Sequence, residues 1–150
     1  MRFLLVFNFT LQKLTMRYEP YEDEYAAISS MTDEERLEYF MFRIAETDEV
    51  WGLKAGSHWI TREFDGRETL PVWPFKRYAE KAAIGDWESL PASAESIEFF
   101  IYQILTKLAI RDVLVEIMPR DTGFGCLISP NRLFSFLEDM RDSGECMVED

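Results

Sequence analysis

Residues 69–79 read TLPVWPFKRYA, and this stretch decides how the middle of the chain folds. Pro71 has no backbone N–H, so the strand that contains it must be an edge strand or must end there. Pro74 favours extended backbone at Trp73, and a proline also suits the first turn of the helix expected over residues 75–84. The stretch therefore predicts a stiff strand-to-helix hinge, with the Trp73 ring anchoring the sheet to that helix.

Three strands are predicted around the hinge, at residues 49–54, 58–63 and 69–73. Residues 55–57 (AGS) turn the chain between the first two strands. Asp65 and Gly66 supply the positive φ angles that a tight hairpin needs between the second and the third. The pattern indicates an antiparallel β-meander.

Two helices are predicted before the meander. Residues 20–29 form the first, with Pro20 at its first position and acidic residues 22–24 near the positive end of the helix dipole. The sequence TDEE at residues 32–35 has the form of a capping box. Apolar residues at helical spacing then predict a second helix that ends near residue 47.

The C-terminal half predicts two more helices and two more strands. Ser93 is expected to cap a helix whose apolar stripe runs from Ile97 to Leu108. Strands are predicted at residues 113–118 and 125–128. Ser129 is expected to cap a last helix that begins at Pro130 and ends before Gly144.

These elements predict one α+β domain, with helices packed on one face of the meander and two helices at its N-terminal end. A length of 150 residues fits a single domain, which we assign to residues 16–150. Residues 1–15 contain two basic and no acidic residues, and a second methionine follows at Met16. We interpret them as an extension from an upstream start codon. The alternation of Phe3, Leu5, Phe7 and Phe9 with their neighbours leaves an extra edge strand open.

The charge and the apolar pattern exclude several classes of protein. A net charge of −12 repels nucleic acid, whose binding depends on Lys and Arg at the phosphates. The same charge keeps a protein soluble and would attract a basic partner. The apolar run at residues 3–9 is too short to cross a membrane, and it lacks a signal-peptide cleavage pattern. We expect a cytoplasmic protein without nucleic-acid or membrane contacts, and the sequence leaves homo-oligomers open.

The sequence contains no recognisable catalytic or metal-binding motif. His58 is the only histidine, and its place beside a turn indicates a surface residue. Cys126 and Cys146 form no CxxC pair, which predicts reduced thiols, Cys126 packed and Cys146 in the tail. DTGFG at residues 121–125 lacks the GK[ST] of a phosphate loop and reads as a turn. We therefore expect no catalytic residue set, no metal and no cofactor.

Carboxylates are numerous, and pairs of them can perform acid–base chemistry when a pocket separates their pKa values. Here they stand at predicted helix starts and at a hairpin tip, where capping and solubility explain them. The groups are residues 22–24, residues 33–35, Glu63, Asp65 and Glu68.

Aromatic residues, which make up 15% of the chain, supply the strongest candidates for a binding surface. Most tryptophans of a small domain belong to its core. A row of them on one face of a sheet can also line a groove for a peptide or a small ligand. The candidate interaction patch consists of Trp51, Trp59, Trp73, Tyr78 and Trp87.

Seven short motifs carry a resemblance to a known family. They are RLEYF (36–40), EVWGL (49–53), LPVWP (70–74), YA (78–79), GDW (85–87), MP (118–119) and ISP (128–130). With them, residues 28–141 resemble a bacterial domain-of-unknown-function family, number twenty-seven-fifty. The family has no established activity, so the resemblance implies no mechanism and no site residues. Residues 1–15 depart from its pattern, which favours the start-codon interpretation.

Two classes of function fit these observations. The first is a non-catalytic cytosolic binding or regulatory module that acts through a protein contact, because the surface is acidic, aromatic residues abound and no catalytic set is present. The alternative is a small enzyme that uses carboxylates or Cys126 in an aromatic-lined pocket. A large exposed apolar patch would favour the first class. A closed pocket with convergent acids of shifted pKa would favour the second.

Overall fold

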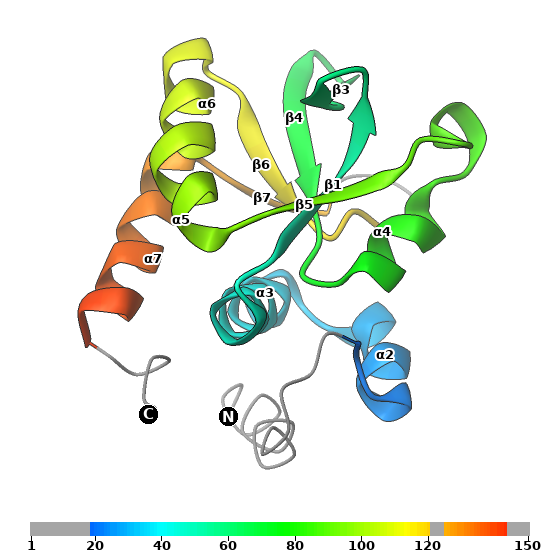
Figure 1. The fold of residues 1–150 in the computed structure, drawn as a ribbon, viewed down its shortest axis with the longest axis horizontal. Helices are drawn as coiled ribbons and strands as arrows, with labels where there is room; N and C mark the ends of the chain where they lie inside the picture. Colours follow the sequence, from blue (N-terminus) through cyan, green and yellow to red (C-terminus); the bar gives the residue numbers. More distant parts are fainter. Residues whose placement is uncertain (1–18, 121–124, 144–150) are drawn as a thin grey trace.

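The computed structural model describes residues 19–120 and 125–143. This part of the chain forms two small β-sheets that are joined at one backbone bridge (Figure 1). The first sheet is antiparallel, in the order β2 (His58–Trp59), β1 (Val50–Ala55), β5 (Ala92–Glu95). The second has the order β3 (Arg62–Phe64), β4 (Arg67–Val72), β6 (Leu114–Ile117), β7 (Cys126–Ile128). In the second sheet β4 and β6 run parallel, and the other neighbours are antiparallel. Trp51 of β1 joins the sheets, since it exchanges two backbone hydrogen bonds of 2.9 Å with Trp73 after β4.

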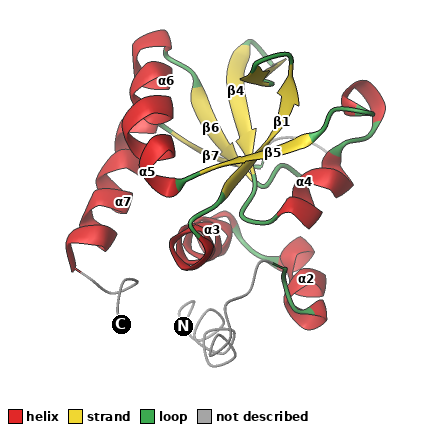
Figure 2. Cartoon of the chain, in the orientation of Figure 1, coloured by secondary structure: helices red, strands yellow, loops and turns green. Residues whose placement is uncertain are grey.

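Helices lie at the left of the two sheets, below them and at their right in the view of Figure 1. Helix α3 (Asp33–Thr47) lies below them in the view of Figure 1, and α2 (Glu22–Ala27) lies beside α4 (Lys76–Ala82) at the right. At the left, one continuous helix contains α5 (Ile97–Phe99), the π-turn η3 (Phe100–Ile104) and α6 (Leu105–Arg111), next to α7 (Pro130–Ser143) (Figure 2). Single 3₁₀ turns follow α2 (η1, Ile28–Ser30) and α4 (η2, Gly85–Trp87). The α+β class and the pair of N-terminal helices are confirmed.

Local sequence signals placed several boundaries correctly. In the capping box, Thr32 Oγ1 accepts the Glu35 N–H at 3.1 Å and Glu35 Oε1 accepts the Thr32 N–H at 2.9 Å. Asp65 and Gly66 have φ angles of 56° and 79° in the tight β3–β4 hairpin. Helix α7 begins at Pro130, as predicted, after the Ser129 cap.

The meander differs from the prediction in its pairing. Both expected hairpins form, but the strand predicted over residues 58–63 is divided at Ile60 and Thr61, and its halves belong to different sheets. Strands from further along the chain add to each half, since β5 pairs with β1 and β6 pairs with β4. The first and third predicted strands, which a meander keeps apart, are joined by the bridge between Trp51 and Trp73.

Two capping predictions are wrong. Ser93 lies in β5 opposite Gly52, and the helix that begins at Ile97 is capped by Ser96, whose Oγ accepts the Phe99 N–H at 3.1 Å. Pro20 precedes the N-cap residue of α2, so it is not the first helical residue. The predictions for residues 1–15, 121–124, Gly144 and Cys146 fall outside the described residues.

The hinge shows how a proline fits inside a sheet. Pro71 lies opposite Glu116 in the parallel pair of β4 and β6. Val72 O accepts the Met118 N–H, so the alternation of the strand turns the nitrogen of Pro71 to the opposite side. On that side the pairing with β3 has already stopped at Thr69. The prediction that the strand ends at Pro71 or is an edge strand is therefore wrong. Strand β4 continues past Pro71 paired with β6, and Pro71 faces the side on which β3 no longer pairs.

Trp73 follows β4 with 2% of its surface exposed, and its ring packs edge-on against Trp87 at a centroid distance of 6.3 Å. The burial agrees with an anchoring role for the ring. The core around it combines residues of the sheets with residues of α3, the long helix and α7. Its largest fully buried apolar side chains are Tyr39, Phe40, Ile44, Leu53, Phe100, Ile101, Leu105, Ile117, Met118, Leu133 and Leu137.

Candidate functional site

A cleft of about 1070 Å³ opens between helices α2 and α4 and the carboxyl ends of the parallel strands β4 and β6. Trp73 follows β4 and Met118 follows β6, and both residues line the cleft. Carboxyl ends of neighbouring parallel strands are where ligands bind in open α/β sheets. Here only β4 and β6 are parallel, and by analogy with those sheets the cleft is the first candidate for a site.

Aromatic rings form much of its wall. Tyr25 of α2 stacks on Tyr78 of α4, with ring centroids 5.2 Å apart and planes within 4°. The Arg77 guanidinium lies 3.8 Å from the Tyr25 centroid and completes a cation–π contact. Trp87 is half-buried against Trp73, so its ring is accessible from the cleft.

The five residues of the predicted interaction patch separate into two groups. Trp73, Tyr78 and Trp87 line the cleft, whereas Trp51 and Trp59 do not. Whether any of the five binds a partner stays a prediction.

Trp51 and Trp59 have packing roles elsewhere. Trp51 donates from Nε1 to Glu49 at 3.2 Å. The Trp59 ring covers the backbone of Gly52, where an added Cβ would lie only 2.4 Å from the ring. A glycine is therefore required under this tryptophan, and the pair explains why EVWGL contains one.

A fully buried carboxylate holds one of the cations of the cleft. Glu116 on β6 has no exposed surface, and it accepts hydrogen bonds from Arg62 Nε at 2.9 Å and Arg62 Nη2 at 2.5 Å. Thr69 Oγ1 at 2.9 Å and the Gly125 N–H at 2.8 Å complete its partners. Arg62 lines the cleft with 26% of its side chain exposed, and its guanidinium lies 5.8 Å from the Trp87 centroid. We call these four residues the Glu116 cluster.

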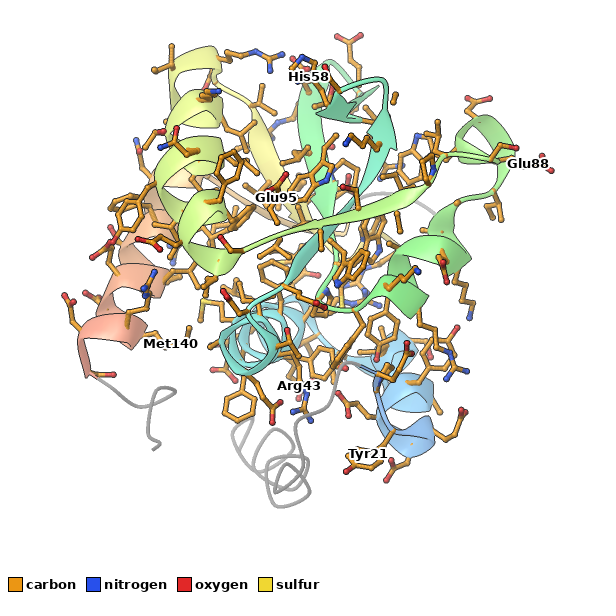
Figure 3. All side chains as sticks on the ribbon, viewed as in Figure 1. Tyr21, Arg43, His58, Glu88, Glu95 and Met140 are labelled. Atoms are coloured by element: carbon orange, nitrogen blue, oxygen red, sulfur yellow. The ribbon has the colours of Figure 1, made fainter. Side chains whose placement is uncertain are left out.

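A second buried carboxylate lies behind the opposite wall. Glu24 of α2 is 1% exposed and accepts from the Tyr39 hydroxyl at 2.5 Å and from Arg43 at 2.8 and 3.2 Å. The Tyr39 and Tyr78 hydroxyl oxygens are 2.8 Å apart, and because Tyr39 donates its only hydroxyl proton to Glu24, Tyr78 is the donor in this pair. Burial raises the pKa of both tyrosines above the ordinary value. Glu24, Tyr39, Arg43 and Tyr78 form the Glu24 cluster, and Figure 3 labels Arg43 on α3.

The Glu24 cluster corrects one prediction. Residues 22–24 are expected to be a solvated acidic helix start, and Glu22 and Asp23 are indeed exposed. Glu24 instead faces the core, because Arg43 and Tyr39 of α3 supply the partners that a buried carboxylate requires. No local pattern distinguishes it from its two acidic neighbours.

Strained backbone forms the floor of the cleft at Met118 and Pro119. Met118 has a φ of 47°, uncommon for a bulky residue, and its carbonyl accepts from Arg36 Nη1 at 2.7 Å. An added Cβ at Gly125 would lie 2.8 Å from the Pro119 Cα, so a glycine is needed where the chain returns. Such strain concentrates at functional sites. Sequence reasoning noted MP only as a motif and did not assign it to a site.

Cys126, the thiol proposed for enzyme chemistry, lies outside the cleft lining, whereas Glu63, one of the candidate carboxylates, lines it. Cys126 on β7 is buried, and burial raises the pKa of its thiol to about 11. It is therefore a neutral thiol at neutral pH. His58 is exposed at the end of the β1–β2 hairpin, at the top of the view in Figure 3. Within residues 19–120 and 125–143, no three His, Cys, Asp or Glu side chains gather closely enough to hold a metal ion.

The family assignment follows from the span of the chain that a family model covers. The model described as "Protein of unknown function (DUF2750)" matches residues 37–137. The chain belongs to the DUF2750 family. No curated protein and no solved structure matches the chain. In the described part of this DUF2750 protein, no helix is both long enough and apolar enough to cross a membrane.

Five of the seven motifs that carry the DUF2750 resemblance contribute to the cleft. RLEYF, LPVWP, YA, GDW and MP each contribute at least one lining residue. Helix α2, which forms one wall, lies outside the matched residues. The matched part of this DUF2750 protein therefore supplies the hinge, α4 and the cleft floor at Met118 and Pro119. Helix α2, which precedes the matched part, supplies one wall of the cleft.

Proposed function

We propose that this protein is a non-catalytic, cytosolic binding or regulatory module that acts through a protein contact, and that the cleft is its binding site. The observation that carries the proposal is the composition of the cleft at the ends of β4 and β6. Its wall offers the half-buried Trp87 ring, and its rim offers Ile84, a large apolar side chain that is 69% exposed. Aromatic and apolar anchors of this kind dominate the energetics of protein contacts.

The enzyme alternative has less support. The thiol of Cys126 is buried and outside the cleft lining, and burial raises its pKa. The buried carboxylates Glu24 and Glu116 are each bonded to an arginine. Glu63 and Asp86 line the cleft, but both are exposed side chains on separate elements. Acid–base catalysis needs two carboxyl groups held in enclosed and unlike surroundings, which these two exposed side chains do not provide.

Two exposed isoleucines provide a matched test. Ile84 lines the cleft at 69% exposure, and Ile110, at the end of α6, is 85% exposed and is not a lining residue. Neither side chain contributes much to the core, so Ile84→Asp and Ile110→Asp should both fold. Each variant and the wild type are immobilised, and proteins captured from a lysate of the source cell are quantified by mass spectrometry.

We expect a partner that the wild type and Ile110→Asp retain equally and that Ile84→Asp loses. Retention by Ile84→Asp at the wild-type level would show that the cleft is not the contact. Turnover of a substrate with loss on substitution of Cys126 or of a cleft carboxylate would support the enzyme alternative instead.

A further inference from the structure

We infer that this protein forms a two-fold symmetric dimer in which strand β5 of one copy pairs antiparallel with β5 of a second copy. No residue of β5 lines the cleft, so the contact is separate from the proposed binding site. A surface that pairs with itself across a two-fold axis closes, which gives a dimer and not a fibre. The sequence leaves homo-oligomers open, and the inference assigns one surface and one register to them.

Strand β5 has one open side. It ends the first sheet, and within residues 19–120 and 125–143 its only strand partner is β1. Figure 1 shows β5 in front of β1, with no helix or strand over it, and its four residues are half-buried. The other strands that end a sheet in this part of the chain, β2, β3 and β7, have two or three residues each. An open edge of this kind is a template for a further strand.

The pairing with β1 shows which backbone groups of β5 point to the open side. The Lys54 N–H donates to Pro91 O at 2.9 Å, so these two residues form a hydrogen-bonded pair. Bonded and non-bonded pairs alternate along an antiparallel ladder, so the N–H and C=O of Ala92 and Ala94 point away from β1. Trp51, opposite Ala94, makes its two backbone bonds on the far side of β1, as this alternation requires. Within the described residues, none of the four outward groups has a hydrogen bond.

One register of two copies satisfies all four of these groups. When Ala92 of each copy faces Ala94 of the other, both pairs exchange two hydrogen bonds, and four donors meet four acceptors. A slip of two residues pairs only one alanine with its own counterpart and places the other opposite Leu90 or Ser96. The Leu90 N–H and the Ser96 C=O already bond within their own chain. The backbone of β5 is therefore complementary to itself in a single register.

Ser93 lies at the two-fold axis in this register, opposite Ser93 of the second copy. The two serines form a non-bonded pair of the new ladder, in which the Cα atoms approach to about 4.5 Å. The Ser93 hydroxyl has no hydrogen-bond partner in the part of the chain that the structure describes, and paired hydroxyls across strands stabilise each other. The flanking side chains are alanines, so the centre of the contact contains no bulky group.

Charge is compatible with this contact only because the edge itself is almost uncharged. Two copies with a net charge of −12 each repel one another. Glu95 is the only charged residue of β5, and the register places it opposite Pro91 of the second copy and not opposite another Glu95. Strand β5 also lacks the lysine or proline with which proteins protect an exposed edge. Association should strengthen as salt rises, because salt screens the repulsion between the two acidic bodies.

Sedimentation velocity of the full chain tests the dimer. We expect twice the mass of one chain at concentrations up to about 100 μM, and a dissociation constant that falls several-fold from low to high salt. Ala94→Pro removes an N–H that β1 does not use, and a proline is tolerated on an edge strand whose N–H faces outward. It removes two of the four hydrogen bonds between the copies, so the dissociation constant should rise about tenfold or more. Thermal melting verifies that the variant is folded.

A matched pair of cysteine variants tests the register, in a background of Cys126→Ala and Cys146→Ser. Ser93→Cys should form a disulfide between two copies on mild oxidation, because a Cα separation of about 4.5 Å lies within the range of disulfides. Glu95→Cys lies on the same face of β5, two residues further on. It should stay monomeric on a non-reducing gel, because the two Glu95 positions are about 13 Å apart along the strands. This comparison changes no backbone hydrogen bond, so it decides the register even if Ala94→Pro does not fold.

Several results would overturn the inference. A single-chain mass at every concentration would reject the dimer, and protection of the Ala92 and Ala94 amides from hydrogen exchange in that monomer would assign the edge to another segment of the same chain. A dimer that is equally tight in Ala94→Pro, or that weakens as salt rises, would place the contact on another surface. Equal disulfide yields from Ser93→Cys and Glu95→Cys would reject the register. None of these results changes the test of the cleft, which depends on Ile84→Asp.

Discussion

Glu24 and Glu116 are both buried carboxylates bonded to an arginine, yet the two arginines lie in different surroundings. Arg43, the partner of Glu24, has a side chain that is 4% exposed, whereas the Arg62 side chain is 26% exposed and lines the cleft. The Glu24 cluster is closed and links α2, α3 and α4. The Glu116 cluster links three strands and presents its cation to the cleft.

A buried carboxylate therefore serves two purposes in this fold. A buried ion pair adds little stability compared with apolar residues of the same volume, but removing one partner is costly because a charge stays buried. In the closed cluster the carboxylate ties α2 to α3. In the open cluster it holds a side chain that lines the cleft. Four experiments test whether this distinction holds.

The largest effect should come from the closed cluster. Arg43→Ala leaves the carboxylates of Glu24 and Glu46 without their cation, and the Glu24 carboxylate is fully buried. The free energy of unfolding should fall by about 3–5 kcal/mol, measured by urea denaturation followed by circular dichroism. The double variant Glu24→Leu, Arg43→Leu should lose less than Arg43→Ala, since it leaves one fewer unpaired charge. A loss below about 1 kcal/mol in Arg43→Ala would contradict the closed cluster.

Arg62→Ala should cost less, about 1–3 kcal/mol in the same denaturation experiment. The vacated volume opens to the cleft, so water can replace the guanidinium beside Glu116. Thr69 and Gly125 also continue to donate to that carboxylate. If Arg62→Ala and Arg43→Ala are equally destabilising, the distinction between an open and a closed cluster is wrong.

Tyr78→Phe should have a smaller effect, about 0.5–1.5 kcal/mol, because it removes one hydrogen bond and keeps the ring. The lost hydroxyl donates to Tyr39, which donates to Glu24. The stack with Tyr25 is retained in the variant. A double-mutant cycle with Arg43→Ala measures the coupling, and strictly additive losses would show that Tyr78 is not part of the Glu24 cluster.

The last prediction concerns the free energy of unfolding above pH 10, because the tyrosine pair makes no pH-dependent contribution at neutral pH. Burial raises the pKa of Tyr39 and Tyr78 above the ordinary value of 10.0, so their contribution is complete below about pH 10. Above it the unfolded chain loses these protons first, and the free energy of unfolding falls as pH rises. In Tyr78→Phe the fall should be shallower. Cys126, with its pKa raised from 9.0 to about 11, acts in the same direction from about pH 9, so both proteins carry Cys126→Ala. Equal slopes would contradict a protonated tyrosine pair in the folded state.

The sequence predicted the aromatic residues of the candidate site but not its charged residues. The hinge between two prolines placed Trp73, Tyr78 and Trp87 close together along the chain, and all three line the cleft. The cations were not foreseen, because the sequence does not tell which of many exposed arginines and lysines face inward. Arg62 is held at the cleft by Glu116, which lies 54 residues further along the chain.

The helix caps, the helical periodicity and the tight turn follow from the sequence alone. The capping box at Thr32, the apolar period of α3 and α7 and the Asp65–Gly66 turn are set by interactions between residues a few positions apart. Such interactions have one favourable geometry for each pattern, so the pattern is sufficient to predict them.

Strand pairing and the burial of charged side chains depend instead on contacts between distant parts of the chain. Strand β5 has the sequence ASAE, which carries no strand signal, and it forms because β1 has an open side for it to pair with. The parallel pairing of β4 with β6 and the burial of Glu24 likewise depend on residues from distant elements. Backbone groups and buried charges must find partners wherever the fold supplies them. The partners lie on elements that are distant along the chain, so a short stretch of sequence does not predict them.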